Sequence, residues 1–219
     1  MREAASALAR FYGPLAAPPR DLFALFVWDV ISARTLPARR DIAWQALKRL
    51  PALTPDAMFR ASKDDLKTAI EGLGAFEERF DTLKHGAGHF RRLRNVPERV
   101  AAGLRSAVRA LADVPNFTPG GRLRALYFAG GYDVPAADDG VARVVTRFAG
   151  LKARPGPPRR RAARHHLAAS FGGDRDALTP ALVLFAHHAA QCCVEQAPHC
   201  GVCPLKATCA SPVGTPPVS

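Results

Sequence analysis

The chain has 219 residues, with 31 Lys and Arg against 19 Asp and Glu, so its formal net charge is +12. No run approaches about 18 consecutive apolar residues, which argues against a membrane span, and the amino terminus lacks the basic and apolar segments of an export signal. The excess of Arg favours a polyanionic partner, with nucleic acid the leading candidate, because guanidinium groups bind phosphate in a bidentate manner. A codon bias that enriches Arg and Ala together would give the same composition.

Helix signals recur along the chain and strand signals are nearly absent, so we expect an all-α protein. Asp21 is expected to cap a helix over residues 22–31 that is apolar nearly all round, which predicts a central position. Three more pairs have the residue types of helix starts: Thr54 with Pro55, Ser62 with Asp65, and Thr179 with Pro180. Further helices are expected near residues 3–12, 40–50, 63–71, 76–93, 97–113, 121–131, 138–149, 159–170 and 180–192.

All five cysteines lie between Cys192 and Cys209. A secreted disulfide framework would spread its cysteines along the chain, so this clustering indicates a metal centre. Four of them, Cys193, Cys200, Cys203 and Cys209, follow the spacing C-x6-C-x2-C-x5-C. Four thiolates suit an iron–sulfur cubane or zinc, and the presence of one C-x2-C pair favours the cubane because zinc modules more often use two. Cys192 lies outside this spacing and is expected to be a packed thiol.

This cysteine pattern, at the carboxyl-terminal end of a helical chain, resembles the endonuclease III and adenine-glycosylase families. These are helix–hairpin–helix DNA glycosylases of base-excision repair. The resemblance implies a [4Fe–4S] cluster on the four cysteines and two helical lobes with a DNA-binding cleft between them. It places a six-helix barrel with an extended, divergent helix–hairpin–helix at residues 21–135, and the cluster lobe at residues 1–20 and 136–219.

The resemblance also implies the partner and the location. The partner is expected to be double-stranded DNA with a damaged or mispaired base, bound by a monomer in the cytoplasm in association with the nucleoid. Because the cluster lobe of these families presents basic side chains to DNA, Arg159, Arg160 and Lys206 are candidate phosphate contacts. For any single Arg here the alternative is a solvated basic linker.

Residues 137–144, Ala-Asp-Asp-Gly-Val-Ala-Arg-Val, are similar to the V-D-T-H-x-x-R-V or L-D-G-N-V-x-R-V segment of these families. The resemblance places Asp138 at the position of the catalytic carboxylate, which stabilises the positive charge developing on the sugar or positions the nucleophile. A fixed anion in a site that excludes water meets that requirement. The alternative is that Asp138 or Asp139 only caps the following helix.

The family hairpin reads L-P-G-V-G-R-K, and its Lys forms the Schiff base that leads to strand cleavage. An ungapped alignment places residues 114–120 on this segment, so that only the proline matches and Gly120 replaces the Lys. A gapped alignment uses residues 119–122 as a shortened hairpin and puts Leu123 at the Lys position. Neither supplies an amine, so lyase activity is not expected. Four residues here are candidate DNA phosphate contacts, or else part of an ordinary turn between helices: Gly120, Gly121, Arg122 and Arg124.

Residues 29–35, Asp-Val-Ile-Ser-Ala-Arg-Thr, align with the E-V-M-L-Q-Q-T segment of the adenine glycosylases. By this resemblance Asp29 is the acid that protonates the departing base, and Arg34 falls near the Gln that fills the gap left by a flipped nucleotide. Two carboxylates, Asp29 and Asp138, suit glycosidic cleavage by water if one donates a proton and the other stays charged. The alternative is a surface or salt-bridged Asp29.

The sequence therefore predicts a DNA N-glycosylase that removes a damaged or mispaired base without lyase activity. One alternative is a bifunctional endonuclease III that cleaves at apurinic or apyrimidinic sites through an amine that the motifs do not identify. Another, of a different class, is a non-catalytic DNA-damage-binding protein. A zinc-bound transcription factor is a further alternative for the cysteine cluster.

Overall fold

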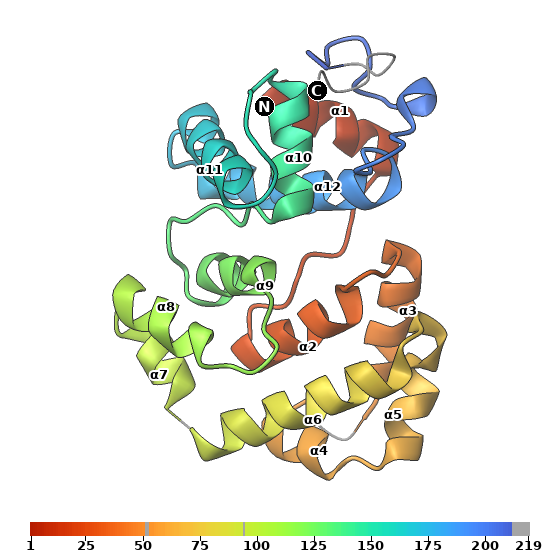
Figure 1. Cartoon of the computed structure of the whole chain (residues 1–219), viewed down its shortest axis with the longest axis vertical. Coiled ribbons are helices and arrows are strands. Elements are labelled where there is room, and N and C mark those ends of the chain that lie inside the picture. Colours follow the sequence, from red (N-terminus) through yellow and green to blue (C-terminus); the bar gives the residue numbers. More distant parts are fainter. Residues whose placement is uncertain (51–52, 94, 212–219) are drawn as a thin grey trace. The chain divides into compact units, whose positions relative to one another are not determined.

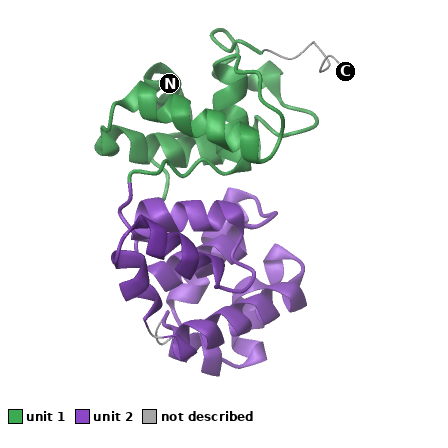
Figure 2. Ribbon diagram, turned by 60° about the vertical axis from the view of Figure 1, so that its left-hand side comes forward, with its two compact units in different colours: residues 1–17, 133–219 green, residues 18–132 purple. Residues whose placement is uncertain are grey.

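The computed structural model describes residues 1–50, 53–93 and 95–211, and this part of the chain contains helices and no strands. The expected all-α class is confirmed. The backbone divides into two compact units, Met1–Ala17 with Asp133–Ser219 (unit 1) and Pro18–Tyr132 (unit 2), as Figure 2 shows. Within the described residues, no helix is both long enough and apolar enough to cross a membrane.

Unit 2 is built around a central apolar helix, α2 (Leu22–Ser32), of which residues 22–31 are all buried, as predicted. The Asp21 carboxylate caps α2 by accepting the Ala24 N–H at 2.8 Å. Helix α2 contacts α3, α6, α9 and η2. The other elements of unit 2 (Figure 1) are α3 (Pro37–Lys48), α4 (Pro55–Arg60), α5 (Lys63–Ile70), the 3-10 turn η1 (Glu71–Leu73), α6 (Phe76–Arg92), α7 (Val96–Ala101), α8 (Leu104–Ala112), α9 (Pro119–Arg124) and the π-helical turn η2 (Ala125–Ala129).

Two more of the expected helix starts in unit 2 are confirmed. The Thr54 hydroxyl accepts the Ala57 N–H at the start of α4. Ser62 and Asp65 form a reciprocal capping box at the start of α5. Such caps satisfy backbone N–H groups that have no partner within the helix, so a short polar side chain before a helix is an informative local signal.

Three expectations about helix boundaries are wrong. The single helix expected over residues 97–113 is two helices, because Gly103 adopts a φ of +125° that only glycine takes readily. The helix expected from residue 121 begins at Pro119, since Thr118 is its cap. Thr179 does not start a helix: α12 (Arg175–Gln191) begins earlier, where the Asp174 carboxylate accepts the Ala177 N–H at 3.0 Å, and Pro180 lies inside it.

Unit 1 joins the first helix of the chain to the last ones. It contains α1 (Arg2–Tyr12), α10 (Asp139–Phe148), α11 (Pro157–Phe171), α12 and the 3-10 turn η3 (Cys200–Val202). Helix α12 packs against both α10 and α1, and α10 also packs against α11. The Arg2 guanidinium donates to Asp174 at 2.9 Å and to the Phe171 carbonyl at 2.9 Å, which fixes α1 beside the α11–α12 connection. At the other end of α1 the Tyr12 hydroxyl lies 2.9 Å from His188 Nδ1, so α1 runs beside α12, the helix that precedes the cysteines.

Candidate functional site

The predicted metal ligands surround one cavity in unit 1. Helix α12 supplies His188, and the segment that follows it supplies the cysteines. The cavity is lined by Val144, Arg147, Phe148, His188, Cys192, Cys193, Pro198, Cys200, Cys203, Leu205, Lys206, Cys209 and Ser211. All four cysteines of the C-x6-C-x2-C-x5-C spacing thus line a common space.

The chemistry of this cavity fits a bound metal centre. Burial raises the pKa of the Cys209 thiol, and the neighbouring Cys193, Cys203 and Cys200 raise it further. Thiolates that converge in an apolar space repel one another unless a cation joins them, and soft thiolate ligands select iron–sulfur clusters or zinc. The residues present therefore fit the expected cluster.

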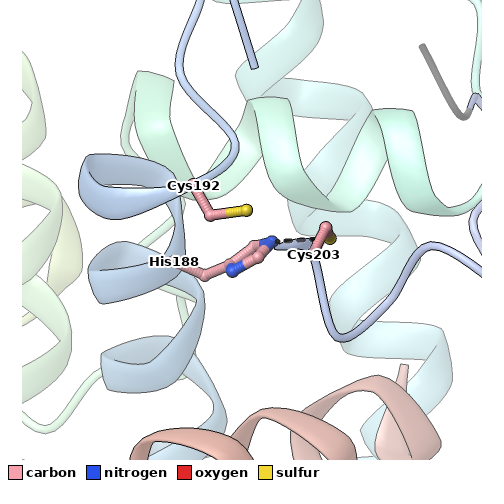
Figure 3. A group of neighbouring side chains, drawn as sticks. All are labelled: His188, Cys192 and Cys203. Carbon is pink, nitrogen blue, oxygen red and sulfur yellow. Dashed lines mark hydrogen bonds between the residues drawn. The ribbon is translucent and has the colours of Figure 1, made fainter. Parts of the chain in front are cut away.

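A tighter group of potential ligands lies inside the same cavity (Figure 3). One ligand atom each from His188, Cys192 and Cys203 all lie within 4.8 Å of one another. Only Cys203 belongs to the predicted four; Cys192 is buried at 6% exposure. Three such atoms suit a single tetrahedral ion, whose sulfur ligands lie about 2.3 Å from the metal, whereas the four spaced cysteines suit a larger centre. The two ligand sets share Cys203.

His188 has a hydrogen-bond partner on each side of its ring. Its Nε2 lies 3.6 Å from Cys203 Sγ (Figure 3), and its Nδ1 lies 2.9 Å from the Tyr12 hydroxyl. Burial lowers the pKa of His188 to about 4 and raises the pKa of Tyr12 to about 12. Sequence reasoning missed both residues. The spacing of His188, one helical turn before Cys192, was an available signal, but nothing in the sequence pointed to Tyr12.

Three arginines hold the beginning of the cysteine segment. Arg143 donates to the Cys193 carbonyl at 2.6 Å, and Arg147 donates to the Val194 carbonyl at 2.7 Å. Arg159 forms a bidentate pair with Glu195, with both distances 2.9 Å, and this pairing lowers the pKa of the carboxyl to about 2. The segment is therefore positioned by charge-assisted hydrogen bonds from α10 and α11.

The predicted phosphate contacts of unit 1 differ in their surroundings. Arg159 is 8% exposed and engaged with Glu195. Arg160 is paired with Asp139, at 2.7 and 2.9 Å from its two carboxylate oxygens. Lys206 is exposed at the rim of the cysteine cavity. Of these three side chains, Lys206 is the one whose surroundings leave it accessible to a polyanion.

Asp138 lies at the start of α10. Its Oδ1 accepts the Val141 N–H at 2.9 Å, so the capping function considered as an alternative is present. Gly140 lets this end of α10 approach α12, because a Cβ there would lie 3.1 Å from the Ala189 Cβ. The cap fixes the carboxylate at the amino-terminal end of α10.

In unit 2, residues 113–118 connect α8 to α9 as a hairpin. Asn116 adopts a left-handed φ of +56° at the position of the first family glycine, a conformation that Asn tolerates better than most residues. Val114 and Phe117 are buried on either side of it. Residues 119–122, which the gapped alignment takes as a shortened hairpin, instead form the first turn of α9. Gly120 is the second residue of that helix.

Asp29 is buried at 2% exposure and both of its oxygens are engaged. Oδ2 accepts a hydrogen bond from the Thr118 hydroxyl at 2.9 Å, and Oδ1 pairs with the Arg124 guanidinium. The salt-bridged alternative for Asp29 is therefore what the structure has. Gly121 is buried against the same carboxylate, since a Cβ there would lie 2.3 Å from Oδ2, and its N–H donates to Thr118 Oγ1 at 2.9 Å.

The remaining candidates of unit 2 lie nearer the surface. Arg122 donates to the Ala112 carbonyl at 3.4 Å. Arg34 has a φ of +52° and forms a bidentate pair with Glu78, at 2.9 and 2.8 Å. Its side chain is 74% exposed, so this pair is screened by solvent. The structure brings together Asp29, Thr118, Gly121 and Arg124, and it leaves Arg34 and Arg122 at the periphery of that group.

The model of the HhH-GPD superfamily of base excision DNA repair proteins matches residues 27–169. The chain therefore belongs to the HhH-GPD superfamily, as the cysteine motif suggested. No match was found among curated protein sequences.

Solved structures of similar fold cover nearly the whole chain. A trapped endonuclease III–DNA covalent intermediate has 17% identity and a TM-score of 0.66, and it covers 95% of this chain and 93% of its own. A non-covalent endonuclease III–DNA complex has 16% identity and a TM-score of 0.67, with the same coverage of both chains. A thermostable thymine-DNA glycosylase has 16% identity and a TM-score of 0.67, and the match covers 95% of both chains. These likenesses show that the fold is of the endonuclease III type.

Proposed function

We propose that this protein is a DNA N-glycosylase of the endonuclease III type that removes a damaged or mispaired base from double-stranded DNA. The observation that carries the proposal is the Asp138 carboxylate, held at the N-cap of α10, and the motif resemblance assigns the catalytic role to this residue. A fixed anion there would stabilise positive charge developing on the sugar as the glycosidic bond breaks. Membership of the superfamily, and the similarity of the fold to endonuclease III in complex with DNA, support this assignment.

We do not expect this protein to have lyase activity. In the ungapped alignment of the hairpin, Gly120 stands where the family carries its Schiff-base Lys. Covalent catalysis of strand cleavage needs an amine that adds to the sugar. Because glycine has no side chain, we expect water to be the nucleophile and the product to be an abasic site.

We further propose that Cys193, Cys200, Cys203 and Cys209 hold a [4Fe–4S] cluster. Support comes from their spacing and from the cavity that all four line. When bound, such a cluster supplies a redox-active cross-link within the segment of residues 193–209. Arg143, Arg147 and Arg159 hold the start of that segment in place. The cluster would fix the rest of the segment, and the exposed Lys206 would then contact a DNA phosphate.

The test is a panel of lesion-containing duplexes, incubated with purified protein and analysed with and without alkali. We expect strand breaks after alkali alone, which is the signature of base removal without lyase activity. Asp138→Asn should lower the rate by about 100-fold or more, and since Asn caps helices as well as Asp does, α10 should stay intact. Asp176→Asn, at an exposed first-turn position of α12, is the matched control. Strand breaks without alkali would instead show a bifunctional enzyme.

One observation favours a second candidate, a DNA-damage-binding protein without chemistry. Both oxygens of Asp29, the expected proton donor, are engaged by Thr118 and Arg124. A carboxylate held in this way is poorly placed to protonate a departing base. Retarded mobility of lesion duplexes, with no cleavage in either condition, would establish this function and overturn the first.

A further inference from the structure

The surroundings of the cysteine cavity include a hydrogen-bonded chain of three side chains that come from three separate parts of the sequence. Tyr12 ends α1, His188 lies near the end of α12, and Cys203 follows η3. The Tyr12 hydroxyl lies 2.9 Å from His188 Nδ1, and His188 Nε2 lies 3.6 Å from Cys203 Sγ. The histidine ring is 1% exposed, so water does not compete for these contacts.

The direction of these hydrogen bonds follows from the chemistry of the cysteine. A metal-bound thiolate has no proton and can only accept a hydrogen bond. The ring nitrogen that faces Cys203 must then carry the proton, and in a neutral ring Nδ1 is left to accept the Tyr12 O–H. The edge-to-face contact between the rings of Tyr12 and His187, with centroids 4.6 Å apart, helps to hold the phenol in place.

We propose that His188 donates its Nε2–H to the Cys203 thiolate of the bound cluster and that Tyr12 positions the histidine ring for this donation. Together the two residues raise the reduction potential of the cluster and slow the loss of the cluster from the protein. The proposal rests on the cluster proposed above. Hydrogen bonds to ligating sulfurs withdraw electron density and favour the reduced, more negative state of an iron–sulfur centre. Partners outside the ligand set also orient the ligands and strengthen metal binding.

The matched variants are His188→Phe, which keeps a ring and removes both nitrogens, and Tyr12→Phe, which removes the hydroxyl alone. His188→Gln restores an N–H donor at the same position. His165→Phe changes an exposed histidine on α11 and serves as the control. All are prepared anaerobically as the full chain, and iron content is measured before any comparison.

Three measurements test the donation without reference to activity on DNA. In a redox titration, His188→Phe should shift the reduction equilibrium by about tenfold toward the oxidised cluster, or about 59 mV for one electron, with a smaller shift of the same sign for Tyr12→Phe. Cluster loss to a chelator should be several-fold faster in both variants and partly restored in His188→Gln. Transfer to deuterated water should shift an Fe–S stretching band more in wild type than in His188→Phe, in which Arg147 still donates to Cys193 Sγ at 3.6 Å.

The failures of the two proposals are distinguishable. A wild-type protein that binds no iron overturns both the cluster and the donation to it. An iron-loaded wild type whose potential and chelation rate do not change in His188→Phe and Tyr12→Phe overturns the donation alone. Loss of iron in His188→Phe, together with an unchanged reduction potential in Tyr12→Phe, would show that His188 is a metal ligand. That result would also overturn the proposed donation. If His188→Phe fails to assemble the cluster, a lowered potential in Tyr12→Phe supports the proposal.

Discussion

Thr118 Oγ1 donates a hydrogen bond to Asp29 Oδ2 at 2.9 Å, and Thr118 Oγ1 in turn accepts the Gly121 N–H at 2.9 Å. The hydroxyl therefore joins the buried helix α2 to the first turn of α9. Arg124, one turn further along α9, pairs with the other oxygen of Asp29. The orientation of the hairpin that precedes α9 thus depends on one buried carboxylate.

Asp29→Asn is expected to destabilise unit 2. The substitution takes the charged partner away from the largely buried Arg124 guanidinium, and breaking a buried ion pair typically costs about 3–5 kcal/mol. Chemical denaturation followed by circular dichroism measures the loss. Asp41→Asn is the control, because Asp41 is half-exposed in its pair with Arg40 and such pairs contribute up to about 1 kcal/mol. An Asp29→Asn variant with wild-type stability and no base release would make Asp29 a catalytic acid instead.

Two glycines of α6 should respond differently to alanine. At Gly86 a Cβ would lie 2.2 Å from the Phe26 ring of α2, so Gly86→Ala forces two packed helices apart, at a cost of about 1–3 kcal/mol or more. At Gly88 the nearest atom, on Phe59, is 3.4 Å away. Gly88→Ala should be neutral or stabilising by up to about 1 kcal/mol, because alanine favours the helix. Thermal melts compare the two, and equal midpoints would contradict the close crossing of α2 and α6.

Removing single cysteines should identify the ligand set. If the four spaced cysteines hold a cluster, alanine at Cys193 or Cys209 should abolish iron binding and the yellow-brown absorbance, whereas Cys192→Ala should retain both. If His188, Cys192 and Cys203 instead hold one zinc ion, Cys192→Ala should lose the metal while Cys193→Ala and Cys209→Ala keep it. Elemental analysis of anaerobically prepared variants for iron and zinc separates these results.

His89 should contribute to a fall in stability as the pH is lowered below about 6.5. Burial of this side chain on α6 lowers its pKa, and the neighbouring Arg92 lowers it further. The unfolded chain therefore binds a proton at a higher pH than the folded chain does. The stability that depends on a neutral His89 is complete above the pKa of this histidine in the unfolded chain. It is lost as the pH falls toward and through the lower pKa of His89 in the folded chain.

The measurement is the free energy of unfolding between pH 7.5 and 5.5. His89→Gln removes the contribution of His89 and leaves that of the buried His188, so its profile should be flatter than that of wild type. His85→Gln changes an exposed histidine on the same helix and should keep the wild-type slope. Parallel profiles for wild type and His89→Gln would show that His89 does not cause the pH dependence.

The sequence alone determined the features that depend on near neighbours. The caps at Asp21 and Ser62 were readable because the groups they satisfy lie within one helical turn. The central position of α2 followed from its apolar surface on all sides. The four cysteines were recognisable because they lie within 17 residues of one another. All of these are short-range patterns.

Tertiary structure decided which distant side chains meet. Tyr12 and His188 are 176 residues apart in sequence, and Asp29 and Arg124 are 95 apart. The Arg-rich stretch gave a charge but not a partner, so the pairing of Arg159 with Glu195 was not foreseen. These contacts depend on how helices pack, and packing is set by the shape and burial of whole helix faces, which no local pattern in the chain specifies.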